Sequence, residues 1–309
     1  MKTNIKKVFI WLGLSILMTI FWIVGLIIGN AIFPSSITEM SADSDSSGGL
    51  ILLLICALNT FVVLYFIYNS QCKGWKMAGT IFLIIFGLQY FMSQIETLWF
   101  NDSLNFPVKG ILAIVSGGAI MNLLFSVTAT WFTGNFSQVK ESAGEKTKVE
   151  LVPMIKYFLL LSIIVWPVIY FLAGYFIAWQ FADVRLLYSG TAEMDSFLSM
   201  MKVNVASGLY FFQILRGVLW ILIALPAVAV IRGSLIRKGV IIGLLFAVLS
   251  SSQLLLPNPF MSDMVRMGHL VETAPSNFIW GFIIAWCFGK LISSEPNESN
   301  FKIPSQNKY

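Results

Sequence analysis

Eight long apolar stretches dominate this sequence of 309 residues. They cover residues 8–33, 50–68, 77–95, 110–132, 154–179, 209–231, 239–257 and 275–292. A helix needs about 20 consecutive apolar residues to cross roughly 30 Å of hydrocarbon. Helices also satisfy their backbone hydrogen bonds within the segment, as a chain surrounded by lipid must. The pattern therefore predicts an all-α integral membrane protein with eight transmembrane helices.

The composition agrees with this prediction. Hydrophobic residues make up 57% of the chain and charged residues only 11%, whereas a soluble domain carries about 25% charged residues. The lipid bilayer is therefore the expected partner, and no nucleic-acid partner and no cofactor are expected. Residues 1–292 are predicted to form a single polytopic membrane domain. Residues 293–309 are polar and are predicted to be a disordered cytoplasmic tail.

The basic residues predict the orientation of the spans. With the N-terminus inside, 15 of the 20 lysines and arginines fall in inner segments, and only Lys109, Arg185, Lys202 and Arg266 fall in outer ones. Short cytoplasmic loops of membrane proteins carry such an excess of positive charge. The sequence therefore predicts a plasma-membrane protein with both termini in the cytoplasm.

Polar residues in unusual places gather toward the predicted outer side. Glu96 ends the third span on the same predicted helical face as Gln89 and Ser93, and Gln213 and Arg216 lie inside the sixth span. Arg216 is seven residues from the outer end of its span, about 10 Å deep. An unpaired arginine at such a depth costs up to about 2.5–3.5 kcal/mol. Glu96, Asp183 and Glu272 are therefore the candidate partners of Arg216.

The stretch 254–281 joins the last two spans and holds His269, which is the only histidine of the protein. At 100° per residue, Met264, Met267 and Val271 share one side of a helix. The opposite side carries Arg266, His269, Glu272 and Thr273. This pattern predicts a short amphipathic helix at about 262–273 that lies along the outer membrane interface. Pro275 is then expected to open the eighth span, with Asn277 just inside it.

An outward-facing polar pocket is the functional hypothesis that these positions favour. The predicted ligand-binding residues are Arg216, Arg266, Asp183, Arg185, Gln213 and Asn277. Several arginines on one side suit an anionic ligand, such as a lipid headgroup or a small carboxylate that is bound or transported. The same residues could instead only tie helix ends together through ion pairs.

Two further hypotheses stay open. An intramembrane hydrolase or transferase would use His269 as a base, with Glu272 or Glu96 to orient it. The chain has no HExxH, GxSG or GxGD motif, and a single histidine makes a metal site an unpromising expectation. The third hypothesis is a non-catalytic accessory or immunity-type membrane protein, whose protein partner the sequence leaves unknown.

Overall fold

The structure is a computed structural model that describes residues 2–35, 48–136 and 151–292. Within these ranges the chain is helical and contains no strand. Eight of the helical segments are long and apolar enough to cross a membrane, as the sequence predicted. The predicted tail at 293–309 lies outside the described residues.

The helices follow the apolar stretches closely. The first four spans are α1 (Lys2–Ile32), α3 (Gly48–Tyr68), the run of α4 (Gly74–Ile85), η1 (Phe86–Phe91) and α5 (Met92–Trp99), and α7 (Val108–Phe132). The fifth is the run of α8 (Leu151–Leu160), η2 (Leu161–Val165), α9 (Trp166–Phe176) and η3 (Ala178–Gln180). The last three are α12 (Leu209–Val230), α13 (Leu235–Ser251) with η4 (Ser252–Leu255), and α14 (Asp263–Ile292).

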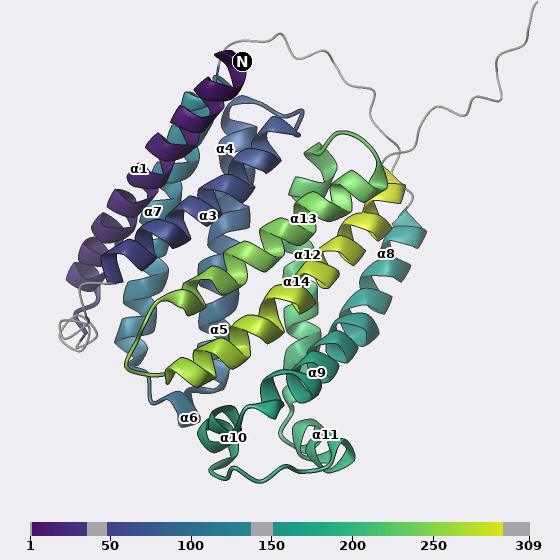
Figure 1. Cartoon of the computed structure of the whole chain (residues 1–309). Coiled ribbons are helices and arrows are strands. Elements are labelled where there is room, and N and C mark those ends of the chain that lie inside the picture. Colours follow the sequence, from purple (N-terminus) through teal and green to yellow (C-terminus); the bar gives the residue numbers. More distant parts are fainter. Residues whose placement is uncertain (1, 36–47, 137–150, 293–309) are drawn as a thin grey trace, which may run out of the picture.

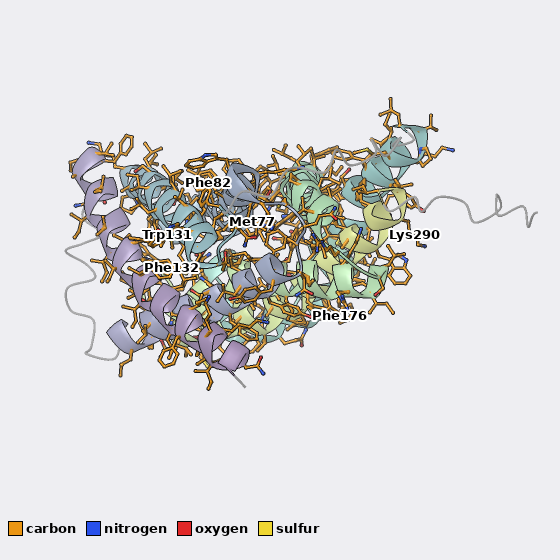
Figure 2. All side chains as sticks on the ribbon, turned by 90° about the horizontal axis from the view of Figure 1, so that it is seen from above. Met77, Phe82, Trp131, Phe132, Phe176 and Lys290 are labelled. Atoms are coloured by element: carbon orange, nitrogen blue, oxygen red, sulfur yellow. The ribbon has the colours of Figure 1, made fainter. Side chains whose placement is uncertain are left out.

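Both described ends of the chain, Lys2 and Ile292, lie at the same end of the bundle, as an even number of spans requires (Figure 1). We call this the termini end. The short helices α6 (Asn101–Leu104), α10 (Ala182–Ser189) and α11 (Phe197–Ala206) lie at the opposite end, which we call the α10 end. Seen from above, α1 and α8 lie at opposite sides of the bundle, and carbon-rich side chains cover its outside (Figure 2).

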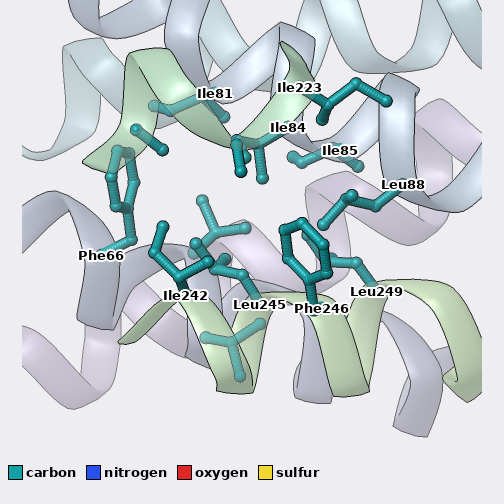
Figure 3. Close-up of a cluster of buried hydrophobic side chains, with 14 of the residues drawn as sticks. Phe66, Ile81, Ile84, Ile85, Leu88, Ile223, Ile242, Leu245, Phe246 and Leu249 are labelled. Atoms are coloured by element: carbon teal, nitrogen blue, oxygen red, sulfur yellow. The ribbon is translucent and has the colours of Figure 1, made fainter. Parts of the chain in front are cut away.

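The centre of the bundle is apolar. Figure 3 shows isoleucines of α4 facing leucines and Phe246 of α13, with Ile223 of α12 beside them. Ile85 and Phe246 are fully buried there. This packing holds the two halves of the chain together and fixes the position of α12.

The first and fourth spans touch through small residues. A Cβ atom added at Gly25 would lie 2.5 Å from the carbonyl oxygen of Gly117, and one at Gly29 would overlap the carbonyl oxygen of Ala113. The GxxxG pattern of Gly25 and Gly29 is therefore the close contact between α1 and α7, which backbones can make only without side chains in between.

Two π-helical turns, η1 and η2, pack against α12. Gly87 in η1 leaves space for Ile223, and Gly217 of α12 lets its helix approach the backbone of Ser162 in η2. A π turn inserts a residue into a helix and changes which way the following side chains face. It follows that η1 and η2 set the direction of α5 and α9, which both supply residues to the site described below.

The structure corrects the prediction of a separate short helix at 262–273. The structure has one 30-residue helix, α14, which continues through Pro275. Proline removes a single backbone donor, here the one that would bond to the Val271 carbonyl, and membrane helices can continue through such a position. The next residue, Ser276, donates its hydroxyl to the Glu272 carbonyl over 2.7 Å in the same turn. The predicted faces were right, since Met264 and Val271 are exposed while Arg266 and Glu272 are buried.

Candidate functional site

One face of α12 carries the central residues of the site. Gln213, Arg216 and Trp220 follow one another at helical spacing and are all buried. Arg216 lies about 10 Å along the helix from Leu209, at the α10 end. A guanidinium therefore lies inside the span and depends on neighbouring helices for partners.

Glu96 of α5 is the partner of Arg216. Nη1 donates to Oε1 over 2.6 Å and Nη2 donates to Oε2 over 2.7 Å, so the pair is bidentate. The Arg216 side chain is only 5% exposed, whereas that of Glu96 is 33% exposed. Of the three partners considered from the sequence, Glu96 makes this contact. The carboxylate forms the accessible half of the pair and the arginine the buried half.

The predicted common face of Gln89, Ser93 and Glu96 is split by η1. Gln89 lies within the π turn and its Oε1 accepts from Asn59 Nδ2 over 3.4 Å, while Asn59 in turn accepts from Ser252. Glu96, beyond the turn, faces α12 instead. The π turn lies between Gln89 and Glu96 and changes their relative direction from that of a regular helix.

Aromatic rings surround the Arg216 guanidinium. Its Cζ atom lies 5.7–5.9 Å from the ring centroids of Trp166, Tyr170, Phe212 and Trp220. Trp166 also donates its indole N–H to Gln213 Oε1 over 3.1 Å, and the same oxygen accepts from Arg216 over 3.2 Å. Cation–π contacts and these hydrogen bonds stabilise the buried charge.

A second group of polar residues lies where α10 docks on α14. His269 Nδ1 is 3.5 Å from Glu272 Oε2, and its Nε2 is 3.2 Å from the Tyr188 hydroxyl. When the hydroxyl donates to Nε2, the ring proton lies on Nδ1 and faces the carboxylate. Both ring nitrogens therefore have partners in this conformation, and the role of His269 as a base stays a hypothesis.

Tyr188 links this group to the Arg216 pair. Burial, followed by the negative charges of Glu96 and Glu272, raises the pKa of the Tyr188 phenol above its ordinary value. The phenol is therefore neutral at physiological pH and can donate a hydrogen bond. Glu96 and Glu272 are therefore both close enough to Tyr188 to raise the pKa of its phenol.

The other predicted ligand-binding residues have structural partners. Arg266 bonds to Asp263 and to the carbonyl oxygens of Leu254 and Leu255, over 3.3 and 3.2 Å. It thus ties the start of α14 to η4. Asp183 accepts a hydrogen bond from Ser262 over 3.0 Å, which fastens α10 to the same place.

Arg185 and Asn277 also have hydrogen-bond partners within the chain. Arg185 donates to the carbonyl oxygens of Trp179 and Ala192, over 2.5 and 2.7 Å. Asn277 donates to the Ser250 hydroxyl over 2.8 Å, between α14 and α13. Each of the three arginines predicted on the outer side, Arg185, Arg216 and Arg266, is held by a different set of oxygen atoms.

Within the described ranges, no three His, Cys, Asp or Glu residues lie together in a way that could hold a metal ion. A zinc ion shared by Glu96, His269 and Glu272 therefore has no support from the geometry.

Sequence reasoning missed the tryptophans of the site. Trp166 lies 5.9 Å from Trp220 and 5.4 Å from Trp280, measured between ring centroids. The three rings come from α9, α12 and α14, and each lies near the middle of its span. Tryptophan is normally enriched at the membrane–water interfaces. Three of them near mid-span were the signal that could have pointed to a polar interior.

An apolar groove lies elsewhere, between α1 and α3. It measures about 330 Å³, and Leu12 and Ile16 of α1 face Leu50 and Leu54 of α3 across it. The one polar side chain in its lining, Ser15, already donates to the carbonyl of Trp11 over 2.7 Å. This groove suits a lipid tail and offers no polar group for recognition.

Comparisons with protein-family models, with curated proteins and with solved structures found no match.

Proposed function

We propose that this multi-pass membrane protein binds or transports an anionic amphiphile, such as a lipid with an anionic headgroup or a fatty carboxylate, at the Arg216 cluster. We define this cluster as Glu96, Gln213, Arg216 and the aromatic rings of Trp166 and Tyr170. The α10 end faces outward and the termini end faces the cytoplasm, in the plasma membrane. Asp183, Arg185 and Arg266 form the rim, and Asn277 holds α14 in place.

The bidentate Glu96–Arg216 pair is the observation that carries this proposal. Arginine forks recognise carboxylates and phosphates through two parallel hydrogen bonds, and here a carboxylate already occupies the fork. The aromatic rings around it suit the alkyl part of an amphiphile. The same contacts that hold Glu96 would thus hold the head of a ligand.

Exchange with Glu96 is the mechanism that the charges favour. Glu96 already pairs with Arg216, so a second anion in the same low-dielectric region would be strongly repelled by its carboxylate. Glu96 is the more exposed member of the pair. Its carboxylate can turn toward water while the ligand oxyanion takes its place on Arg216.

Replacing Glu96 with glutamine tests this exchange. The purified chain in a non-ionic detergent is titrated with dodecyl phosphate, and thermal unfolding gives the affinity from the ligand-dependent rise in Tm. Glu96→Gln removes the competing carboxylate, so we expect a lower Tm without ligand and an affinity for dodecyl phosphate that is at least about tenfold higher. Arg216→Gln is expected to abolish the ligand effect.

Glu193→Gln is the matched control, since Glu193 is an exposed carboxylate beyond α10 and its loss changes the net charge equally. It should bind like the natural chain. Dodecanol, which has the same tail without charge, should give no Arg216-dependent shift. An affinity that falls in Glu96→Gln, or equal effects of dodecanol and dodecyl phosphate, would contradict the proposal.

Orientation gives a separate prediction. In a chain whose three cysteines are replaced by alanine, Asp102→Cys in α6 should react with a membrane-impermeant maleimide on intact cells. Lys73→Cys, at the termini end, should react only after the membrane is permeabilised. Both positions are exposed, so access to the reagent depends on the side of the membrane. The reverse labelling pattern would place the termini outside.

A further inference from the structure

Four buried N–H groups of residues around Trp166 have no hydrogen-bond partner among the described residues. They are Gln213 Nε2, Arg216 Nε, Trp220 Nε1 and Trp280 Nε1. Each of these residues is at most 4% exposed. Buried polar groups in proteins nearly always have a partner, so such a set calls for an explanation.

These four groups belong to one place in the bundle, because all four side chains contact Trp166. Gln213 accepts the hydrogen bond of its indole over 3.1 Å, and the Arg216 Cζ atom lies 5.7 Å from its ring. Trp220 and Trp280 pack against it at 5.9 and 5.4 Å. We call Gln213, Arg216, Trp220 and Trp280 the donor set.

The donor set offers only hydrogen-bond donors. All four unpartnered atoms are N–H donors, although glutamine could have offered an oxygen; that oxygen is already used by Trp166 and Arg216. Trp220 lies one helical turn beyond Arg216, about 6 Å deeper into the span. Gln213 lies one turn from Arg216 in the opposite direction, so the donors of α12 lie on both sides of the arginine along the helix.

We infer that the donor set is a binding site for an oxyanion head with more acceptor oxygens than a carboxylate, namely the phosphate of a phosphate monoester or phospholipid. This inference rests on the proposed function and specifies its ligand. Two phosphate oxygens occupy the Arg216 fork in place of Glu96, and the remaining oxygens accept from Gln213, Trp220 or Trp280. Acceptor oxygens suit the donor set, because its four unpartnered atoms are all N–H donors.

A comparison of two probes tests this assignment on the natural chain. Dodecyl phosphate and dodecanoate share a tail length, but the two carboxylate oxygens of dodecanoate are used up by the fork, as those of Glu96 are. Dodecyl phosphate is therefore expected to bind at least about tenfold more tightly, since hydrogen bonds to a charged acceptor are among the stronger ones.

Trp280→Phe and Trp220→Phe then remove one donor each while keeping an aromatic ring. Each is expected to weaken dodecyl phosphate binding about tenfold and to change dodecanoate binding less than twofold, so that the preference for phosphate is lost. Trp75→Phe, at an exposed ring near the termini end, is the control and should retain the preference. Native mass spectrometry with phosphatidic acid and inorganic phosphate distinguishes a lipid source from a free anion.

The outcomes separate the two proposals. If dodecyl phosphate and dodecanoate bind equally well and both depend on Arg216, water fills the donor set; the inference is then wrong while the proposed function stands. Equal loss of both probes in Trp280→Phe also overturns the inference, because it indicates a packing effect. If neither probe binds to the natural chain, the proposed function and the inference fail together. The comparison of the two probes uses the natural chain. It therefore still tests the inference if one of the tryptophan variants does not fold.

Discussion

Arg216→Leu is expected to lower the free energy of unfolding by about 3 kcal/mol. Removing one member of a buried ion pair costs about 3–5 kcal/mol because the other charge stays without a partner. The lower part of this range applies, since Glu96 is one-third exposed and can reach water. Denaturation of the purified chain in mixed micelles, followed by circular dichroism, measures the change.

The double variant Glu96→Leu with Arg216→Leu makes this prediction sharper. Replacing both charges by apolar side chains leaves no uncompensated charge, so the double variant should be more stable than Arg216→Leu alone. Lys202→Leu in α11 removes an exposed cation and should change the stability by less than about 0.5 kcal/mol. An Arg216→Leu variant as stable as Lys202→Leu would show that the pair contributes nothing to folding.

Gly29→Leu is expected to destabilise the bundle by about 3 kcal/mol, the upper part of the usual range for overpacking, and to separate α1 from α7. A Cβ atom at this position overlaps the backbone carbonyl of Ala113, and backbone cannot move aside as a flexible side chain can. The same measurement of unfolding in micelles tests it, with susceptibility of α1 to added protease as a second readout.

Gly13→Leu is the matched control within the same helix. A Cβ atom added at Gly13 would have no neighbour within 4 Å, so this substitution should change the stability by less than about 0.5 kcal/mol. The seam between α1 and α7 would not depend on Gly29 if both variants unfolded alike.

The predicted spans were accurate because each depends on local hydrophobicity. The bilayer requires a run of apolar residues of a certain length, and this requirement is met or not met within a single segment. The two faces at the start of α14 were also predictable, since helical periodicity places Met264 and Glu272 on opposite sides. The continuation of the helix through Pro275 was not, because hydroxyl side chains and neighbouring helices decide whether a proline ends a helix.

The candidate site was only partly predictable. Arg216 and Glu96 stood out because charge inside a span is unfavourable without a partner. That Arg185 and Arg266 bond elsewhere could not be read from the chain, since their partners are mostly backbone carbonyls whose positions depend on local turns. Trp280 gave no signal that it would contact Trp166, more than a hundred residues away.

By itself the sequence determined that this protein lies in a lipid bilayer and how many spans it has. The length of an apolar run and the spacing of its charges are properties of a single segment, so no tertiary contact is needed to recognise them. Only the tertiary structure decided which side chains contact Arg216. The π turns η1 and η2 redirect α5 and α9, and Gly217 lets α9 approach α12, so that Glu96 and Trp166 reach the arginine. These contacts depend on how the helices pack, and packing depends on all the contacting surfaces at once.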